Sequence, residues 1–212
     1  MIRMLIADDH AIVREGLKKI FSLIPDVEVV AEAGDGAEVL RHLAGPADFD
    51  LLLLDLTMPG LSGITLIERI KTRCPNLPIL IFSMHNESQI ALRTIKAGAS
   101  GYIAKDSDPE VLLAAIRRVA DGGKYIDPKL AEQLAFESVF PEQREPHARL
   151  SDREFEIFRL LVAGKRVNEI ADLLSISNKT VSTHKIHLMG KMDLTNAAEL
   201  VHYAIEKNLF LY

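Results

Sequence analysis

The side chains of this sequence best suited to chemistry are three aspartates, a serine and a lysine, each following a short apolar run. They are Asp8, Asp9, Asp55, Ser83 and Lys105. Carboxylates crowded within a few ångströms repel one another unless a cation lies among them, and an all-oxygen cluster suits Mg²⁺ rather than zinc. Magnesium with a lysine and a hydroxyl can neutralise a transferring phosphoryl group. If the fold brings these side chains together, they predict phosphoryl chemistry.

Asp55 ends the most apolar of these runs. The four leucines at 51–54 predict a strand covered on both faces, as in a parallel sheet packed between helices. Turn-forming residues follow at 58–60 and 62–63, so Asp55 is expected at the carboxyl end of a central strand, where open α/β sheets bind ligands. A lone aspartate in this position more often caps or solvates the strand end. The rest of the chain decides whether Asp55 is alone.

Alternating periodicities predict the elements that would gather these residues. Strands are expected at 2–7, 27–33, 51–54, 79–82 and 101–103, and helices at 13–24, 37–43, 64–70, 88–97 and from 109 to the glycines at 122–123. Such alternation implies right-handed crossovers and an α/β fold with a flavodoxin-like, doubly wound, five-stranded parallel sheet. The carboxyl ends of its strands share one edge, so the aspartates, Ser83 and Lys105 should converge there.

Composition bounds the class of protein. At 212 residues, with 48% apolar and 26% charged residues, the chain is globular and we expect two modest domains. Cys74 is the one cysteine, which excludes an internal disulfide and favours a reducing, cytoplasmic setting. No apolar run approaches the roughly 18 residues of a membrane span, so we expect a soluble protein without a membrane partner.

The second part of the chain is purely helical. A capping box at Ser151 and Glu154 starts one helix, 167–174 and 178–192 predict a short and a longer helix around a tight turn, and a last helix is expected at about 196–207. This arrangement is typical of an all-α, four-helix, helix-turn-helix domain whose second helix enters the DNA major groove. Periodicity alone leaves a helical protein-binding module as an alternative.

Charge is distributed unevenly between the two parts. Residues 1–122 contain 13 Lys and Arg against 17 Asp and Glu, a net charge of −4, whereas 147–212 contain 9 against 8, a net of +1. The stretch 177–191 has three lysines and no acid. The local charge of a surface matters more than the net charge of the chain when that surface meets phosphates.

The spacing within the longer helix separates an inward from an outward face. Val181, Leu188 and Met192 share one face and should point inward. The side chains left for DNA are Lys179, Ser182, Thr183, Lys185 and Ile186. Lysine suits phosphate or a guanine edge, hydroxyls suit several base edges, and isoleucine suits a thymine methyl. Each single lysine could equally be a solvated surface charge.

Two groups of motifs carry a resemblance to a known family. Those in the first half are Asp8-Asp9-His10, 55–60, Ser83, 98–102 and 104–105, and those in the second half are 150–154, 169–171, 174–177 and 179–184. The first group resembles the receiver domain of bacterial two-component response regulators, and the other group is similar to the LuxR-type helix-turn-helix. Together they resemble the NarL/FixJ class, with a receiver at 1–122, a linker with a short helix at 123–146 and a DNA-binding domain at 147–212.

The resemblance implies a role for each motif residue. Asp55 would accept a phosphoryl group from the phosphohistidine of a sensor histidine kinase, and Lys105 would pair with the phosphoryl oxygens. Asp8 and Asp9 would hold Mg²⁺ together with the Asp55 carboxylate and the Thr57 backbone carbonyl. Ser83 would swing to the phosphoryl group and let Tyr102 rotate inward.

The resemblance also implies a transcription regulator, not an enzyme, that acts on double-stranded promoter DNA as a phosphorylation-enhanced homodimer. A phosphatase of the haloacid-dehalogenase type is a rival, but such enzymes need a second aspartate where Thr57 stands. A second rival is a protein that binds DNA independently of phosphorylation. The presence of Asp8, Asp9 and Asp55 together with Lys105 argues against it. His10 beside the acids could be a metal ligand, although a structural or gating role is the favoured interpretation.

Overall fold

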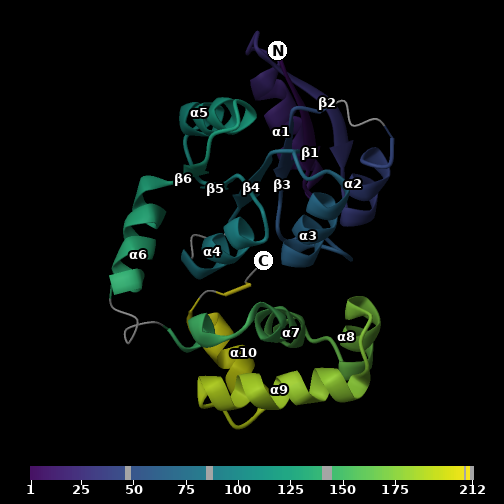
Figure 1. Cartoon of the computed structure of the whole chain (residues 1–212), viewed down its shortest axis with the longest axis vertical. Helices are drawn as coiled ribbons and strands as arrows, with labels where there is room; N and C mark the ends of the chain where they lie inside the picture. The colour runs from purple at the N-terminus through teal and green to yellow at the C-terminus, as the bar shows by residue number, and fades with distance from the viewer. Residues whose placement is uncertain (46–48, 85–87, 140–144, 208, 211–212) are drawn as a thin grey trace. The chain divides into compact units, whose positions relative to one another are not determined.

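The computed structural model describes residues 1–45, 49–84, 88–139, 145–207 and 209–210 (Figure 1). Contacts divide the chain into two compact units, Met1–Leu134 and Ala135–Tyr212, and each is described by itself. In the described parts, no helix is long and apolar enough to cross a membrane.

The first unit is built on a parallel sheet with the strand order β2-β1-β3-β4-β5-β6. The strands are β1 Ile2–Ala7, β2 Val27–Ala33, β3 Leu51–Leu54, β4 Ile79–Ser83, β5 Gly101–Ala104 and β6 Tyr125–Ile126. Strand order reverses between β1 and β3, so these two neighbours form the switch point at which open α/β sheets bind ligands. The doubly wound parallel sheet is therefore confirmed.

Helices cover both faces of this sheet (Figure 1). They are α1 Ala11–Phe21, α2 Gly36–His42, α3 Gly63–Arg73, α4 Ser88–Lys96 and α5 Pro109–Ala120. Helix α6 Pro128–Val139 follows β6 and crosses the boundary between the two units. Alternate strand residues such as Met4, Ile6 and Leu53 pack with α1 and α5 in one buried cluster. All four leucines of β3 are buried, which confirms that this strand is covered on both sides.

The sheet has six strands, not the five predicted. The additional strand β6 has two residues, too few for any periodicity to reveal it, and it lies in the stretch predicted as linker. Its approach to β5 depends on Gly101, where an added Cβ would lie 2.8 Å from the Tyr125 carbonyl oxygen. The short helix expected in the linker is α6, which ends at Val139. Asp108 precedes α5, but its side chain makes no capping hydrogen bond.

The second unit is entirely helical. It contains the 3₁₀ helix η2 Pro146–Arg149 and the helices α7 Asp152–Val162, α8 Val167–Leu174, α9 Asn178–Met192 and α10 Ala197–Glu206. The bounds predicted for α8 and α9 are confirmed, and Ser175 makes the turn between them with a left-handed φ of 53°. Val181, Leu188 and Met192 are buried as predicted. The capping box of Ser151 and Glu154 is present at the start of α7.

Gly190 weakens α9 without any packing reason. It is exposed, it lies within the helix, and an added Cβ would meet no atom within 4 Å. We expect Gly190→Ala to raise the free energy of unfolding by about 0.5–1 kcal/mol, because alanine loses less conformational freedom on folding. Chemical denaturation of the full chain measures this change.

Gly164 is the matched control for that substitution. It also has no atom within 4 Å of an added Cβ, but its φ is +77°. Alanine is disfavoured in this conformation, so Gly164→Ala should destabilise the chain. A loss of stability in both variants would contradict the explanation for Gly190.

Candidate functional site

Asp8 and Asp55 stand side by side at the carboxyl ends of two neighbouring strands. The Asp55 backbone N–H donates to the Ala7 carbonyl oxygen at 2.8 Å, and that of Asp8 donates to Ala33 at 3.0 Å, so pairing of the strands fixes both positions. Both residues are only 1% exposed. The predicted convergence of these acids is therefore what the structure shows, and Asp9 adds a partly exposed carboxylate at the rim.

Lys105 brings a positive charge to the same place from the end of β5. Its Nζ lies 2.6 Å from Asp8 Oδ2 and 3.1 Å from Asp55 Oδ2, and its side chain is 9% exposed. Its backbone N–H donates to the carbonyl oxygen of Ser83 at 2.8 Å. Two buried carboxylates share this one ammonium, so their negative charge is only partly compensated.

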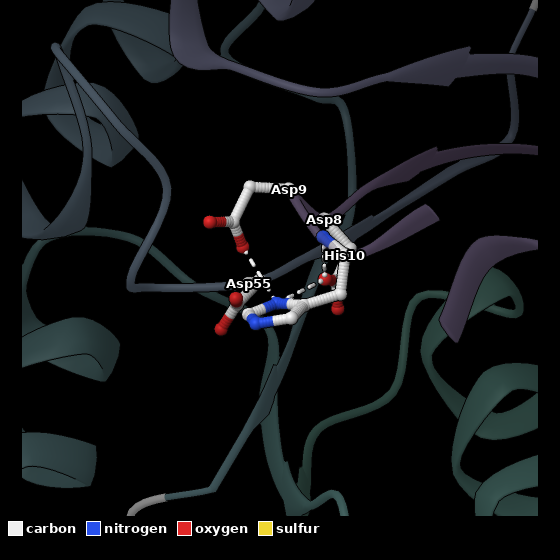
Figure 2. Close-up of side chains that lie close together, drawn as sticks. All are labelled: Asp8, Asp9, His10 and Asp55. Atoms are coloured by element: carbon white, nitrogen blue, oxygen red, sulfur yellow. Dashed lines mark hydrogen bonds and ion pairs between the residues drawn. The ribbon is translucent and has the colours of Figure 1, made fainter. Parts of the chain in front are cut away.

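The acidic cluster fits a divalent cation. Asp55 Oδ1 is buried and accepts no hydrogen bond from the described residues, while Oδ2 accepts one from the Thr57 hydroxyl at 3.0 Å. Asp8 Oδ2 contacts the Lys105 ammonium but has no hydrogen bond of favourable geometry. One ligand atom from each of Asp8, Asp9, His10 and Asp55 lies within 4.8 Å of the others (Figure 2). Oxygen-rich clusters of this kind hold Mg²⁺ in proteins.

His10 is tied to the acidic cluster through both its backbone and its ring. Its backbone N–H donates to Asp8 Oδ1 at 2.9 Å. Its Nδ1 lies 2.8 Å from Asp9 Oδ1 and 3.3 Å from Asp8 Oδ1 (Figure 2). Arg14 holds the same strand end by donating from Nη1 to the Asp8 carbonyl oxygen at 2.6 Å. Sequence alone could not place the imidazole between two carboxylates.

Ser83 and Tyr102 lie on the neighbouring strands β4 and β5. Ser83 ends β4, is fully buried and pairs in register with Ala104, which precedes Lys105. Tyr102 is 1% exposed and stands opposite Ile81 of β4 and Ile126 of β6. The predicted switch pair therefore lies on adjacent strands that end at the site.

The second unit presents the outer face of α9. Four of the residues predicted to meet DNA are exposed, namely Lys179, Ser182, Thr183 and Ile186, and the Ile186 side chain is 70% exposed. Lys185 is half-buried. Ser177 caps the helix by accepting from the Thr180 backbone N–H at 3.1 Å. The apolar Ile186 therefore lies among hydroxyls and lysines on one helix face, and this combination suits the base edges of the DNA major groove.

Lys191 has a different role from the other lysines of α9, which sequence reasoning missed. Its Nζ lies 2.6 Å from Oε2 of Glu154, the buried acid of the α7 capping box. Burial raises the pKa of Glu154, but hydrogen bonds from Lys191 and Ser151 outweigh it and lower the pKa to about 2. The partners are 37 residues apart in the chain, so no local pattern could have revealed the pair. This ion pair fastens α9 to α7.

The lowered pKa of Glu154 makes the stability of this unit depend on pH. A carboxylate whose pKa is depressed from 4.5 to about 2 contributes stability that is complete above pH 4.5 and is lost as the pH falls toward 2. Because the lysine is partly exposed and screened, we expect Glu154→Gln to lower the free energy of unfolding at pH 7 by about 2 kcal/mol. Denaturant titrations from pH 7 to 2 measure this.

In the Glu154→Gln variant, the dependence of stability on pH between 4.5 and 2 should also weaken. Glu206→Gln, at an exposed position of α10, is the matched control and should behave like the parent chain. Identical pH profiles for Glu154→Gln and the parent would show that the ion pair contributes nothing.

Comparison with known proteins decides the family. Residues 4–117 match the response regulator receiver domain, and residues 148–204 match the bacterial regulatory proteins of the LuxR family. The chain belongs to the NarL/FixJ class of response regulators. It is therefore a DNA-binding regulator composed of a receiver and a LuxR-type helix-turn-helix domain.

Similar response regulators span the whole chain. The oxygen regulatory protein NreC of Staphylococcus epidermidis is 40% identical, with 98% of this chain and 99% of NreC covered. The response regulator UvrY of Escherichia coli strain K12 is 34% identical, with 99% and 96% covered. Among solved structures, RcsB of Salmonella typhimurium is 33% identical with a TM-score of 0.80, and 97% of each chain is covered.

A second RcsB structure, from Salmonella enterica serovar Typhimurium, is bound to the promoter rprA in the presence of the phosphomimetic BeF3⁻. It is 32% identical with a TM-score of 0.77, and 95% of this chain and 97% of that chain are covered.

Proposed function

We propose that Asp55 accepts a phosphoryl group from the phosphohistidine of a sensor histidine kinase, and that this modification controls DNA binding by α9. The observation that carries the proposal is Asp55 Oδ1, a buried carboxylate oxygen that accepts no hydrogen bond from the described residues. An oxygen with a free lone pair beside a shared ammonium is suited to attack phosphorus.

Each residue of the site has a part in this transfer. The Asp55 oxygen forms a bond to phosphorus while the bond from phosphorus to the kinase imidazole nitrogen breaks, and the departing imidazole takes its proton from solvent. Lys105, now shared between Asp8 and Asp55, would turn its ammonium to the phosphoryl oxygens. Asp8 and Asp9, with the Asp55 carboxylate and the Thr57 carbonyl, would hold Mg²⁺. When bound, Mg²⁺ neutralises charge that develops on the phosphoryl oxygens.

Ser83 and Tyr102 would relay the modification. The Ser83 hydroxyl would move to the phosphoryl group, and Tyr102 would occupy the space it leaves. Phosphorylation adds charge and strong acceptors, so it can bias such a pair between two arrangements. Their positions on adjacent strands that end at the site support this relay.

DNA is the proposed partner of the second unit. Helix α9 would enter the major groove of promoter DNA, with Lys179, Ser182, Thr183, Lys185 and Ile186 as candidate contacts. We propose a homodimer enhanced by phosphorylation, so that two helices read two half-sites. RcsB, a structural neighbour, has been solved with promoter DNA, which supports this partner. A promoter as target implies a cytoplasmic location.

Stoichiometry separates this proposal from the rival phosphatase. A phosphoacceptor incubated with Mg²⁺ and a small phosphodonor such as acetyl phosphate gains one phosphoryl group per chain, which intact-mass spectrometry detects. A phosphatase would instead hydrolyse phosphate esters through many turnovers. Catalytic turnover without accumulation of the modified chain would overturn the proposal. Thr57, in place of the second aspartate of such enzymes, favours the acceptor.

A further inference from the structure

The imidazole of His10 adds a nitrogen to a cluster that is otherwise made of oxygens. Its Nδ1 lies 2.8 Å from Asp9 Oδ1 and 3.3 Å from Asp8 Oδ1, and Figure 2 shows the ring joined to both acids by dashed lines. The side chain is 63% exposed.

The spacing of these groups is close to that of a metal coordination sphere. Six ligands at about 2.1 Å from an ion lie about 3.0 Å or 4.2 Å from one another. One ligand atom from each of Asp8, Asp9, His10 and Asp55 falls within 4.8 Å of the rest, so small side-chain rotations would bring all four to an ion. By this measure of distance, His10 belongs to the cluster as fully as Asp9 does.

A second observation points to a ligand at this place. Asp55 is 1% exposed, and its Oδ1 accepts no hydrogen bond from the described residues, although a buried carboxylate oxygen is normally satisfied. The backbone around His10 is also fixed, because its N–H bonds to Asp8 Oδ1 and it stands at the N-cap of α1. The imidazole therefore belongs to one cluster with a carboxylate whose Oδ1 is unsatisfied.

Nitrogen changes which cations the cluster prefers. Magnesium takes oxygen ligands and gains little from an imidazole, whereas imidazole suits zinc and other late first-row metals. For a mixed nitrogen and oxygen site, affinity rises from Mn²⁺ through Co²⁺ to Cu²⁺. The all-oxygen description expected from the aspartates is thus incomplete.

We propose that His10 is a further metal ligand, which makes this a mixed site able to bind late first-row divalent cations such as Co²⁺ and Zn²⁺ more tightly than Mg²⁺. This inference rests on the cation site of the proposed function and adds its metal selectivity. It departs from the structural or gating role that sequence analysis favoured for His10.

Metal titration of the full chain tests the inference without any measurement of phosphorylation. Co²⁺ binding is followed by its visible absorption, and Mg²⁺ binding is followed by competition with Co²⁺ and by calorimetry. His10→Ala should weaken Co²⁺ binding by about 10-fold or more and shift the visible band, while it changes Mg²⁺ affinity by less than about 3-fold. His10 makes no side-chain capping bond, so the variant loses none.

His202→Ala removes a second exposed histidine, on α10, and should leave both affinities unchanged. If His10→Ala binds Co²⁺ as tightly as the parent, or if both variants lose the same affinity, His10 is not a ligand and the inference is wrong. If the parent chain binds neither Mg²⁺ nor Co²⁺, the cation site of the proposed function itself fails. If the parent chain binds Mg²⁺ but His10→Ala leaves its affinity for Co²⁺ unchanged, the role of His10 in metal selectivity is wrong while the cation site of the proposed function stands.

Discussion

Replacing Asp55 with asparagine is expected to reduce phosphorylation of this chain by on the order of 10³-fold or more, because the amide removes the attacking oxygen anion. Asparagine has nearly the same shape, and Lys105 keeps Asp8 as a partner at 2.6 Å, so the unit should stay folded. Incubation with Mg²⁺ and acetyl phosphate, followed by intact-mass spectrometry, measures the modified fraction.

Asp106→Asn is the matched control for this substitution. Asp106 is exposed and follows Lys105 directly, but it is outside the cluster of Asp8, Asp9, His10 and Asp55. The control variant should be modified like the parent. Equal modification of Asp55→Asn and the parent would show that another residue accepts the phosphoryl group, and the role assigned to Asp55 would have to be abandoned.

The substitution Lys179→Glu should weaken DNA binding by about 100-fold at low salt, because the chain loses one contact to a DNA phosphate and gains a carboxylate that the phosphate repels. Lys179 is exposed in the first turn of α9, whereas Lys185 is half-buried and Lys191 is paired with Glu154. Of these three lysines, Lys179 is therefore the one best placed to contact a DNA phosphate. Fluorescence anisotropy with labelled DNA at several salt concentrations measures the loss and the salt dependence.

Lys129→Glu makes the same change of charge at an exposed position near the start of α6. It reports how much any charge reversal weakens binding through the overall field of the protein. We expect at most a few-fold effect from it. Equal losses in both variants would mean that Lys179 makes no specific contact and that another surface meets the DNA.

Elements that depend on local pattern could be predicted from sequence. The bounds of α8 and α9 and the inward face formed by Val181, Leu188 and Met192 follow from helical periodicity. The leucines of β3 identified a strand covered on both faces, and the parallel topology then required Asp8, Asp55 and Lys105 to share one edge. Topology converts residues far apart in sequence into neighbours, which explains why the site was predictable.

Features that depend on tertiary contact could not be predicted. Strand β6 is two residues long, and the sheet edge recruits it through the close approach at Gly101. The ion pair of Glu154 and Lys191 joins two helices across 37 residues, so Lys191 was counted only as part of a basic stretch. His10 directly follows Asp8 and Asp9 in the sequence, but only the structure shows that its ring contacts both carboxylates.

The DNA affinity of the full chain, measured with and without the phosphodonor and Mg²⁺, tests the control of DNA binding through Asp55 most directly. DNA selected from a random pool by the phosphorylated protein supplies the probe, and parent and Asp55→Asn chains are compared. We predict that treatment raises the affinity of the parent by about 10-fold or more and leaves Asp55→Asn unchanged. If treatment leaves the parent unchanged, or raises the affinity of both chains equally, control of DNA binding through Asp55 is contradicted.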